Sequence, residues 1–306
     1  MEVDELVARV SAGEARAVAR LISWVEDGAP DLPEALEALP PGASAYVIGL
    51  TGSPGVGKST VTSALVGAYR ARGQRVGVLA IDPSSPFTGG ALLGDRIRMQ
   101  EHATDPGVFI RSMASRGHLG GMAAATPQAV RVLEAAGCDV VLIETVGVGQ
   151  SEVDVAATAD ATVVLLAPGM GDGVQAAKAG ILEIADIVCV NKADREGAEA
   201  TARDVRQMLR LGTPADGWTP LVVTSVAAQG AIDDLLGALD ERRAWLDEGD
   251  RAVQRRRARA SAEILALASG RSRILLAERL SPEVINAVAD GRLSSFAAAD
   301  GLLSER

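Results

Sequence analysis

The sequence predicts an α/β protein with a doubly wound, mostly parallel sheet, preceded by a helical extension and followed by a helical arm. Two observations support this prediction. Between residues 45 and 245, short continuous apolar runs alternate with helix-length segments. Such runs are typical of strands buried on both faces of a parallel sheet that is covered by helices. Residues before 45 and after 245 instead show helical spacing without a sheet pattern.

The first 44 residues are expected to form a helical N-terminal extension. Apolar residues recur there at roughly helical spacing, with charged residues between them: Leu6, Val7, Val10, Val18, Leu21 and Ile22. The tripeptide Ser11-Ala12-Gly13 can divide this stretch into two helices. The prolines from Pro30 to Pro41 are expected to end it.

Residues 45–245 are expected to form one α/β domain. Apolar runs that we interpret as its strands cover residues 46–50, 75–81, 108–110, 139–143, 161–166, 187–190 and 221–223. Segments of helix length lie between them at residues 58–72, 126–136, 173–185 and 196–211. Strands and helices that alternate in this way imply a doubly wound sheet.

Residues 246–306 are expected to form a helical arm. A charge run at residues 254–259 precedes apolar positions at helical spacing, and further helical patterns follow at 273–280 and 282–290. This segment is too small to build a large core of its own, so it should pack on the α/β domain or on a second subunit. We interpret the triple arginine at 255–257 as a solvated helix face, with a partner or nucleotide contact as the alternative.

Composition excludes several classes of protein. The chain has 306 residues, a formal net charge of −10 and 48% hydrophobic residues, which is too apolar for a disordered chain. The acidic balance argues against nucleic-acid binding, and the two cysteines, Cys138 and Cys189, cannot form a disulfide scaffold. Without a long apolar run or a basic N-terminal leader, we expect no membrane span and a cytoplasmic location.

A glycine-rich phosphate-loop pattern, G-x-x-x-x-G-K-[ST], lies between a predicted strand and a predicted helix. It comprises Gly52, Ser53, Pro54, Gly55, Val56, Gly57, Lys58, Ser59 and Thr60. Glycines let backbone N–H groups surround phosphate oxygens, and the helix N-terminus adds free donors. Lys58 can reach the β- and γ-phosphates and Ser59 can bind Mg²⁺, so the pattern predicts a nucleoside triphosphate site.

A second pattern, N-K-x-D, indicates which base is bound. Asn191, Lys192 and Asp194 follow the strand predicted at 187–190. A carboxylate can accept from both guanine N1–H and the exocyclic amine, a donor pair that adenine lacks. The next strand is followed by Ser225, Val226 and Ala227, where a second base-contacting loop is expected.

Further carboxylates follow predicted strands at the expected ligand crevice. Glu144 and Gly147 resemble the D-x-x-G switch of GTPases with Glu in place of Asp, so Glu144 can hold Mg²⁺ and Gly147 can contact the γ-phosphate. Gln150 in the same segment can orient a water molecule or be a solvated loop residue. Asp82 ends a strand, and Asp95 lies in a loop, where it is a metal candidate or a helix N-terminal charge. A magnesium ion on a triphosphate needs one or two carboxylates, so this set exceeds the requirement.

Together these patterns resemble the MeaB-like GTPases, also called ArgK-type. The resemblance covers roughly residues 45–240 and rests on the two nucleotide patterns and on longer segments. These segments are Ile81-Asp-Pro-Ser-Ser, the stretch 88–99, Arg116-Gly-His-Leu-Gly-Gly, Glu144-Thr-Val-Gly-Val-Gly-Gln-Ser-Glu and the loop 168–178. The helical N-terminal extension and C-terminal arm also match in kind.

The resemblance implies a P-loop NTPase fold and a GTPase that acts as a chaperone. The family's clients are adenosylcobalamin-dependent acyl-CoA mutases such as methylmalonyl-CoA mutase, whose cofactor loading it gates and which it protects or rescues. It implies a phosphate and magnesium site made of Lys58, Ser59, Asp82, Asp95 and Glu144, and guanine contacts from the N-K-x-D residues. It also implies switches at 144–154 and 168–178 and a homodimer joined through the arm.

Two other functions share the phosphate loop. A small-molecule kinase or ATPase of the arginine/ornithine transport type would need an acceptor pocket and little guanine selectivity. A nickel-delivery GTPase would need His- or Cys-rich ligand tracts, whereas His102, His118, Cys138 and Cys189 are scattered along the chain.

Overall fold

A computed structural model describes residues 2–40, 44–82, 101–102, 104–114, 122–145, 151–169, 181–211 and 217–304. These residues form a seven-stranded sheet in the order β3-β2-β4-β1-β5-β6-β7, with every neighbouring pair parallel. The strands are β1 (Tyr46–Thr51), β2 (Val76–Asp82), β3 (Val108–Ala114), β4 (Val140–Thr145), β5 (Ala161–Leu166), β6 (Ile187–Asn191) and β7 (Leu221–Ser225). The predicted doubly wound parallel sheet is therefore confirmed.

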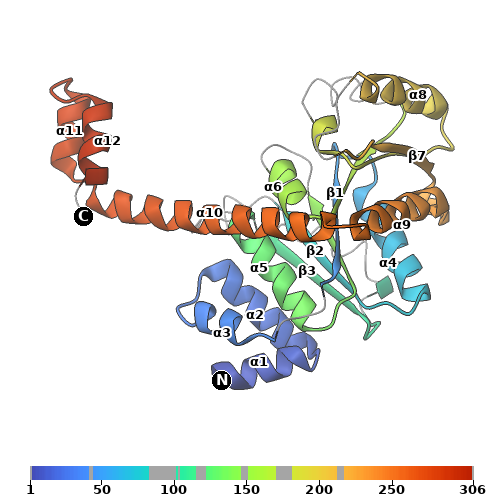
Figure 1. The fold of residues 1–306 in the computed structure, drawn as a ribbon, viewed down its shortest axis with the longest axis horizontal. Coiled ribbons are helices and arrows are strands. Elements are labelled where there is room, and N and C mark those ends of the chain that lie inside the picture. The colour runs from blue at the N-terminus through green and yellow to red at the C-terminus, as the bar shows by residue number, and fades with distance from the viewer. Residues whose placement is uncertain are drawn as a thin grey trace.

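Helices surround the sheet and extend the chain at both ends (Figure 1). They are α1 (Val3–Ser11), α2 (Ala15–Asp27), α3 (Leu32–Ala38), α4 (Lys58–Ala71), α5 (Met122–Ala135), α6 (Ser151–Thr158), α8 (Ala198–Leu209), α9 (Asp233–Asp247), α10 (Arg251–Arg279), α11 (Pro282–Ala289) and α12 (Ser295–Ser304). Two short 3-10 helices are η2 (Ile181–Ile184) and η3 (Ala227–Gln229).

Several helices differ from the sequence expectation. Pro33 does not end the N-terminal stretch, because it lies in the first turn of α3, where its missing N–H costs nothing. The predicted switch 144–154 includes the start of a helix, α6, at Ser151. Most of the helix predicted at 173–185 lies outside the described residues, and its end forms η2. The charge run at 254–259 and the helical pattern at 273–280 lie on one continuous helix, α10.

The two faces of the sheet carry different helices because successive strand residues point in opposite directions. In β1, Val47 belongs to a core cluster that includes α1, α2, α3 and α5. The next residue, Ile48, belongs to a second cluster with α4 and α9. Both clusters are mainly aliphatic, as expected for a chain with 3% aromatic residues.

The C-terminal arm leaves the body of the molecule as one long helix, with α11 and α12 at its far end (Figure 1). Within α10, all of which is described, only Gly270 is buried. Arg256 and Arg257 are exposed, as expected for a solvated face, but Arg255 is partly buried and contacts the body. Within the described ranges, no helix combines the length and apolar character that crossing a bilayer requires.

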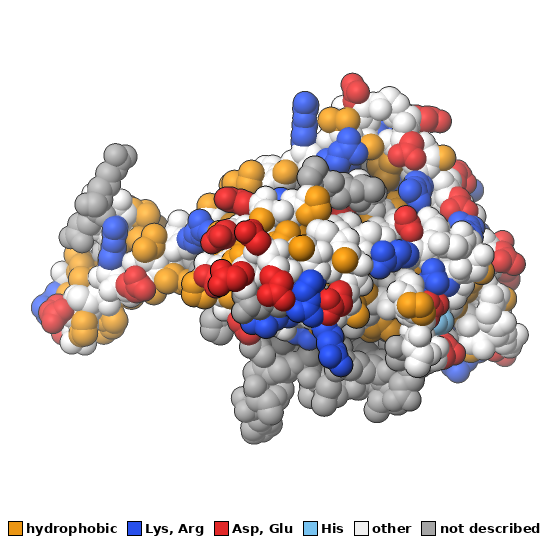
Figure 2. All heavy atoms as spheres, turned by 90° about the horizontal axis from the view of Figure 1, so that it is seen from below, with side chains coloured by type: hydrophobic (Ala, Val, Ile, Leu, Met, Phe, Trp, Pro, Cys, Tyr) orange, Lys and Arg blue, Asp and Glu red, His pale blue; other side chains and the backbone are white. Residues whose placement is uncertain are grey.

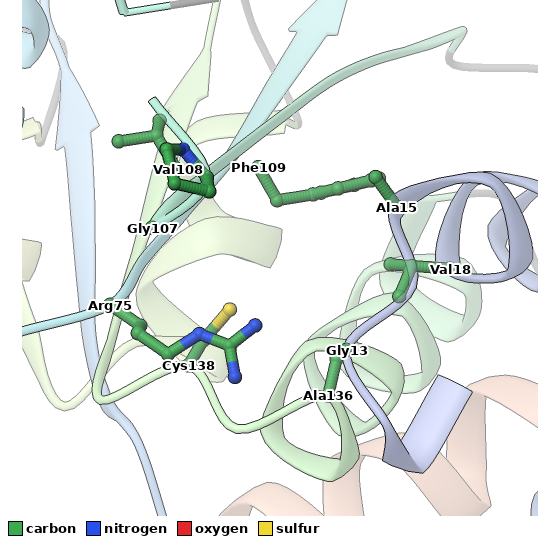
Figure 3. Close-up of a pocket in the computed structure, with 10 residues that line it drawn as sticks. Gly13, Ala15, Val18, Arg75, Gly107, Val108, Phe109, Ala136 and Cys138 are labelled. Atoms are coloured by element: carbon green, nitrogen blue, oxygen red, sulfur yellow. The ribbon is translucent and has the colours of Figure 1, made fainter. Parts of the chain in front are cut away.

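A small cavity of about 30 Å³ lies at the amino-terminal ends of β2 and β3, beside the turn between α1 and α2 (Figure 3). Gly13, Arg75 and Cys138 are among its lining residues. A cavity of this volume cannot hold a nucleotide. The nucleotide-binding patterns lie at the opposite, carboxyl-terminal ends of the strands.

Candidate nucleotide site

The phosphate loop connects the end of β1 to the start of α4, as the sequence predicts. Gly57 precedes the helix with φ 97°, a left-handed conformation that side chains rarely adopt. A Cβ atom at this position would lie 2.5 Å from Asn191 Nδ2. Glycine is therefore required here both by the backbone angle and by the close approach of the loop after β6. The first N–H groups of a helix have no partner within it, so the start of α4 suits an anion.

Lys58 begins α4 and folds back over the loop. Its Nζ donates hydrogen bonds to the carbonyl oxygens of Gly52 at 2.7 Å and Ser53 at 3.1 Å. The side chain is buried, whereas Thr60, two residues on, is exposed. The ammonium group is thus held against the loop backbone, where phosphate oxygens could replace carbonyl oxygens as its partners.

Glu144 lies beside the phosphate loop because β4 pairs with β1, with Glu144 opposite Leu50. Its Oε1 accepts a hydrogen bond from Ser59 Oγ at 2.7 Å, and its Oε2 accepts one from Thr62 Oγ1 at 2.9 Å. Thr62 is a site residue that the sequence patterns missed. Its place three residues after Ser59, on the same face of α4, was the signal that could have identified it.

Ser59 and Glu144 provide oxygen donors of the kind that Mg²⁺ prefers, so the described part of the predicted metal site fits this ion. Asp82 ends β2 at the same edge of the sheet, but its side chain is not among the described ones. Asp95 and Gly147 lie outside the described residues, as do Gln150 and His118. Among the residues that are described, no three His, Cys, Asp or Glu side chains gather into another metal site.

Asn191 joins the phosphate loop to both predicted base loops. Its Nδ2 donates to the Val56 carbonyl oxygen at 2.9 Å. Its Oδ1 accepts from Ser225 Oγ at 3.1 Å and from the Ala227 backbone N–H at 3.2 Å. The side chain is 3% exposed, and all these contacts are internal. Asn191 is therefore a structural bridge that holds three loops together.

The rest of the N-K-x-D loop also contacts the phosphate loop. Lys192 has φ 59°, rare for a residue with a side chain, and its Nζ donates to the Gly55 carbonyl oxygen at 2.6 Å. Strained backbone of this kind concentrates at functional sites. Asp194 in the same loop is exposed, so its carboxylate is accessible.

A buried thiol supports the second base loop. Cys189 Sγ lies 3.2 Å from Ser225 Oγ, and Ser225 Oγ donates to Asn191. Burial raises the pKa of Cys189 to about 12, so the thiol keeps its proton and can donate it to Ser225. Val226 is held by its backbone contacts with Ala231 and is partly buried.

The structure therefore brings most of the predicted site to one edge of the sheet. The phosphate loop follows β1, Glu144 is the next-to-last residue of β4, and the base loops follow β6 and β7. In open α/β sheets, ligands bind at the carboxyl ends of the strands, which is where these groups lie. A glycine-rich loop at a helix N-terminus, a buried carboxylate bonded to the serine of that loop and an exposed carboxylate in the loop after β6 form an arrangement that suits a nucleoside triphosphate.

Several known proteins are similar to this chain over most of its length. A putative GTPase of Pyrococcus abyssi is 47% identical over 316 residues, which cover 99% of this chain and 96% of the relative. A Caenorhabditis elegans protein named methylmalonic aciduria type A homolog, mitochondrial, is 40% identical over 64% of this chain and 51% of the relative. The crystal structure of a LAO/AO transport system kinase superposes with a TM-score of 0.74 at 28% identity, covering 98% of this chain and 96% of the other.

The family described as methylmalonyl Co-A mutase-associated GTPase MeaB matches residues 18–279, from α2 to the end of α10. This range includes the phosphate loop, Glu144 and both base loops. The match confirms the resemblance to MeaB-like, ArgK-type GTPases that the sequence patterns indicated. The chain belongs to the MeaB family of P-loop GTPases.

Proposed function

We propose that this GTPase hydrolyses GTP with Mg²⁺ at the edge formed by β1, β4, β6 and β7. The hydrogen bond from Asn191 Nδ2 to the Val56 carbonyl oxygen carries the proposal, because it fixes the base loop directly against the phosphate loop. One nucleotide can then contact both. Phosphoryl transfer requires mainly positioning and charge stabilisation, and these residues provide both.

Each group has a role that follows from its contacts. Lys58 and the free backbone N–H groups of the phosphate loop would bind the β- and γ-phosphates. Ser59 and Glu144 would hold Mg²⁺, with Asp82 and Asp95 as further candidates and Gly147 at the γ-phosphate. The bound ion would offset phosphate charge. Asp194 would accept from guanine, and residues 225–227 would border the base.

We further propose that the nucleotide cycle serves an adenosylcobalamin-dependent acyl-CoA mutase. The family description names association with methylmalonyl-CoA mutase, and the Caenorhabditis elegans relative carries the name methylmalonic aciduria type A homolog. In this proposal the GTPase gates cofactor loading and protects or reactivates the mutase. Exposed apolar side chains along the arm support a homodimer joined there (Figure 2).

The test is a capture experiment combined with kinetics. The purified protein, loaded with GDP or with a nonhydrolysable GTP analogue, is mixed with methylmalonyl-CoA mutase and with an unrelated acyl-CoA enzyme as control. We expect nucleotide-dependent capture of the mutase and a severalfold increase in GTP turnover. A turnover that is already fast and that no acyl-CoA mutase changes would contradict the chaperone role.

A transport-type small-molecule kinase is the second candidate, because the superposed crystal structure is that of a LAO/AO transport system kinase. This activity would need a phosphate acceptor and would require no preference for guanine. Equal affinity for ATP and GTP, together with transfer of labelled phosphate to arginine or ornithine, would support it. Exclusive release of inorganic phosphate from GTP would contradict it.

A further inference from the structure

Arg255 attaches the arm to the end of α6. Its Nε donates to the Ala159 carbonyl oxygen at 2.9 Å, and its Nη2 donates to the Ala156 carbonyl oxygen at 2.5 Å. These carbonyl groups belong to the last turn of α6 and the residue that follows it, where a helix has unpaired acceptors and partial negative charge. Burial lowers the pKa of Arg255, while Asp186 and Asp160 oppose that effect. The negative charges of these two aspartates therefore offset part of the cost of burying the Arg255 guanidinium in the α/β domain.

Arg259, one turn further along α10, attaches the arm to the start of β1. Its Nη2 lies 2.5 Å from Asp160 Oδ1. The other carboxylate oxygen of Asp160 accepts from the Val47 backbone N–H at 2.9 Å, and the Asp160 N–H donates to the Val47 carbonyl oxygen at 2.7 Å. Both charged side chains are at most 15% exposed. Asp160 is thus shared between α10 and the strand that leads into the phosphate loop.

α6 lies directly on that strand. A Cβ atom at Gly49 would lie 2.5 Å from Val155 Cγ1 and 3.2 Å from Ala159 Cβ, so only glycine permits this contact. Gly49 is three residues before the phosphate loop begins at Gly52. α6 also follows β4, whose Glu144 binds the phosphate-loop serine. The helix therefore touches the element before the phosphate loop and follows the strand of the metal-binding carboxylate.

We infer that Arg255 and Arg259 are positioning residues that couple the arm to the nucleotide site through α6 and β1. This inference rests on the proposed function. A change at the site that displaces α6 or β1 must break or move these hydrogen bonds, because the guanidinium groups contact backbone carbonyls and a buried carboxylate directionally. Coupling free energies are reciprocal, so the attachment of the arm must in turn affect nucleotide preference.

The test compares two variants with two matched controls on the same helix. Arg255→Met and Arg259→Met remove the contacts, whereas Arg256→Met and Arg257→Met remove exposed charges nearby. For each protein we measure the affinity for fluorescent GDP and for a fluorescent nonhydrolysable GTP analogue, and we take the ratio of the two affinities as the nucleotide preference. We expect the ratio to change at least about fivefold in the first pair and to stay within about twofold of wild type in the controls.

Two further measurements separate coupling from simple destabilisation. Arg255→Lys can still donate to one carbonyl oxygen, so we expect its ratio of GDP to GTP-analogue affinity to lie between those of wild type and Arg255→Met. A variant that is only less stable would have a lower melting temperature but the wild-type ratio. In the wild-type chain, hydrogen exchange in α6 and α10 should differ between the GDP and GTP-analogue states. This measurement does not depend on whether any variant folds.

The outcomes distinguish this inference from the proposed function. Ratios for Arg255→Met and Arg259→Met that equal those of the controls would overturn the coupling, and so would identical exchange of α6 and α10 in both nucleotide states. In either case guanine-nucleotide binding by the wild type would still stand. A wild-type protein that binds neither guanine nucleotide would instead overturn the proposed site and, with it, the coupling.

Discussion

Asn191 and Asp194 lie three residues apart in one loop but have opposite environments. Asn191 is buried and makes internal hydrogen bonds to the phosphate loop and the loop after β7. Asp194 is exposed, and its backbone neighbour Ala193 is anchored by a hydrogen bond to the Ser225 carbonyl oxygen at 3.0 Å. The buried residue positions the loop, and the exposed carboxylate is the group that we propose selects the base.

We predict that Asp194→Asn changes the base preference. An amide can accept from only one guanine donor and places its own N–H₂ against the other, so GTP affinity should fall about 100-fold. Xanthosine triphosphate, which has a carbonyl oxygen in place of the amine, should bind better than GTP. Competition with a fluorescent guanine nucleotide measures both. Glu196→Gln, at another exposed carboxylate of this loop, is the control, and an unchanged preference in Asp194→Asn would refute the assignment.

Ser59 and Thr60 provide a matched pair for the metal site. The Ser59 hydroxyl is buried and bound to Glu144, whereas Thr60 is exposed. We predict that Ser59→Ala raises the Mg²⁺ concentration for half-maximal GTP hydrolysis about tenfold, because one oxygen donor is lost. GDP affinity in EDTA should hardly change. Thr60→Ala should behave like wild type, and an equal Mg²⁺ requirement in the two variants would contradict the predicted ligand.

At the level of elements, the buried Arg242 side chain of α9 forms an ion pair that ties this helix to the sheet. Arg242 is 2% exposed, and its Nη2 lies 2.8 Å from Asp186 Oδ1. Its guanidinium lies 5.0 Å from the centre of the Trp218 ring and 4.6 Å from that of Trp245. Asp186 also accepts from the Thr162 N–H at 2.7 Å, so the ion pair connects α9 to the starts of β5 and β6.

We predict that Arg242→Met lowers the free energy of unfolding by about 3 kcal/mol, because Asp186, whose side chain is only 14% exposed, then loses this cation. Arg243→Met is the control. Arg243 is partly exposed and lies 5.2 Å from the Tyr46 ring, so its removal should cost about 1 kcal/mol or less. Urea unfolding of the nucleotide-free proteins measures both free energies. Equal losses of stability in the two variants would show that the Arg242–Asp186 ion pair contributes no more than the exposed Arg243.

The elements that could be predicted from sequence are those whose signal is local. Continuous apolar runs identified all the strands of the described sheet, and the glycine spacing identified the phosphate loop. Thr62 and Arg255 were missed because their partners are distant: Thr62 and Glu144 are 82 residues apart, and Arg255 and Ala156 are 99 apart. The start of α6 was missed because Gly147 and Gly149, just before it, indicated that the loop continued. Only the fold brings these groups together.

At the scale of the whole molecule, the arm carries apolar surface that the described part of the chain leaves exposed. Ile264 and Leu265 are 65% and 64% exposed on α10, and Phe296 on α12 is 86% exposed. Figure 2 shows hydrophobic side chains along the arm and at its outer end. Apolar side chains that gather on one exposed part of a folded protein suit an interaction site, and the proposed homodimer would bury them against a second copy.

We predict that the wild-type chain is a dimer in solution and that Leu265→Glu makes it a monomer, because the charge would have to be buried at the joined arms. Sedimentation at micromolar concentration measures the mass. Leu211→Glu is the matched control, since Leu211 is 86% exposed just beyond α8, away from the arm. Nucleotide affinity should stay within about threefold of wild type in the monomer, because the phosphate and base loops belong to one chain. A monomeric wild type, or a Leu265→Glu variant that remains dimeric, would show that the arm serves another contact.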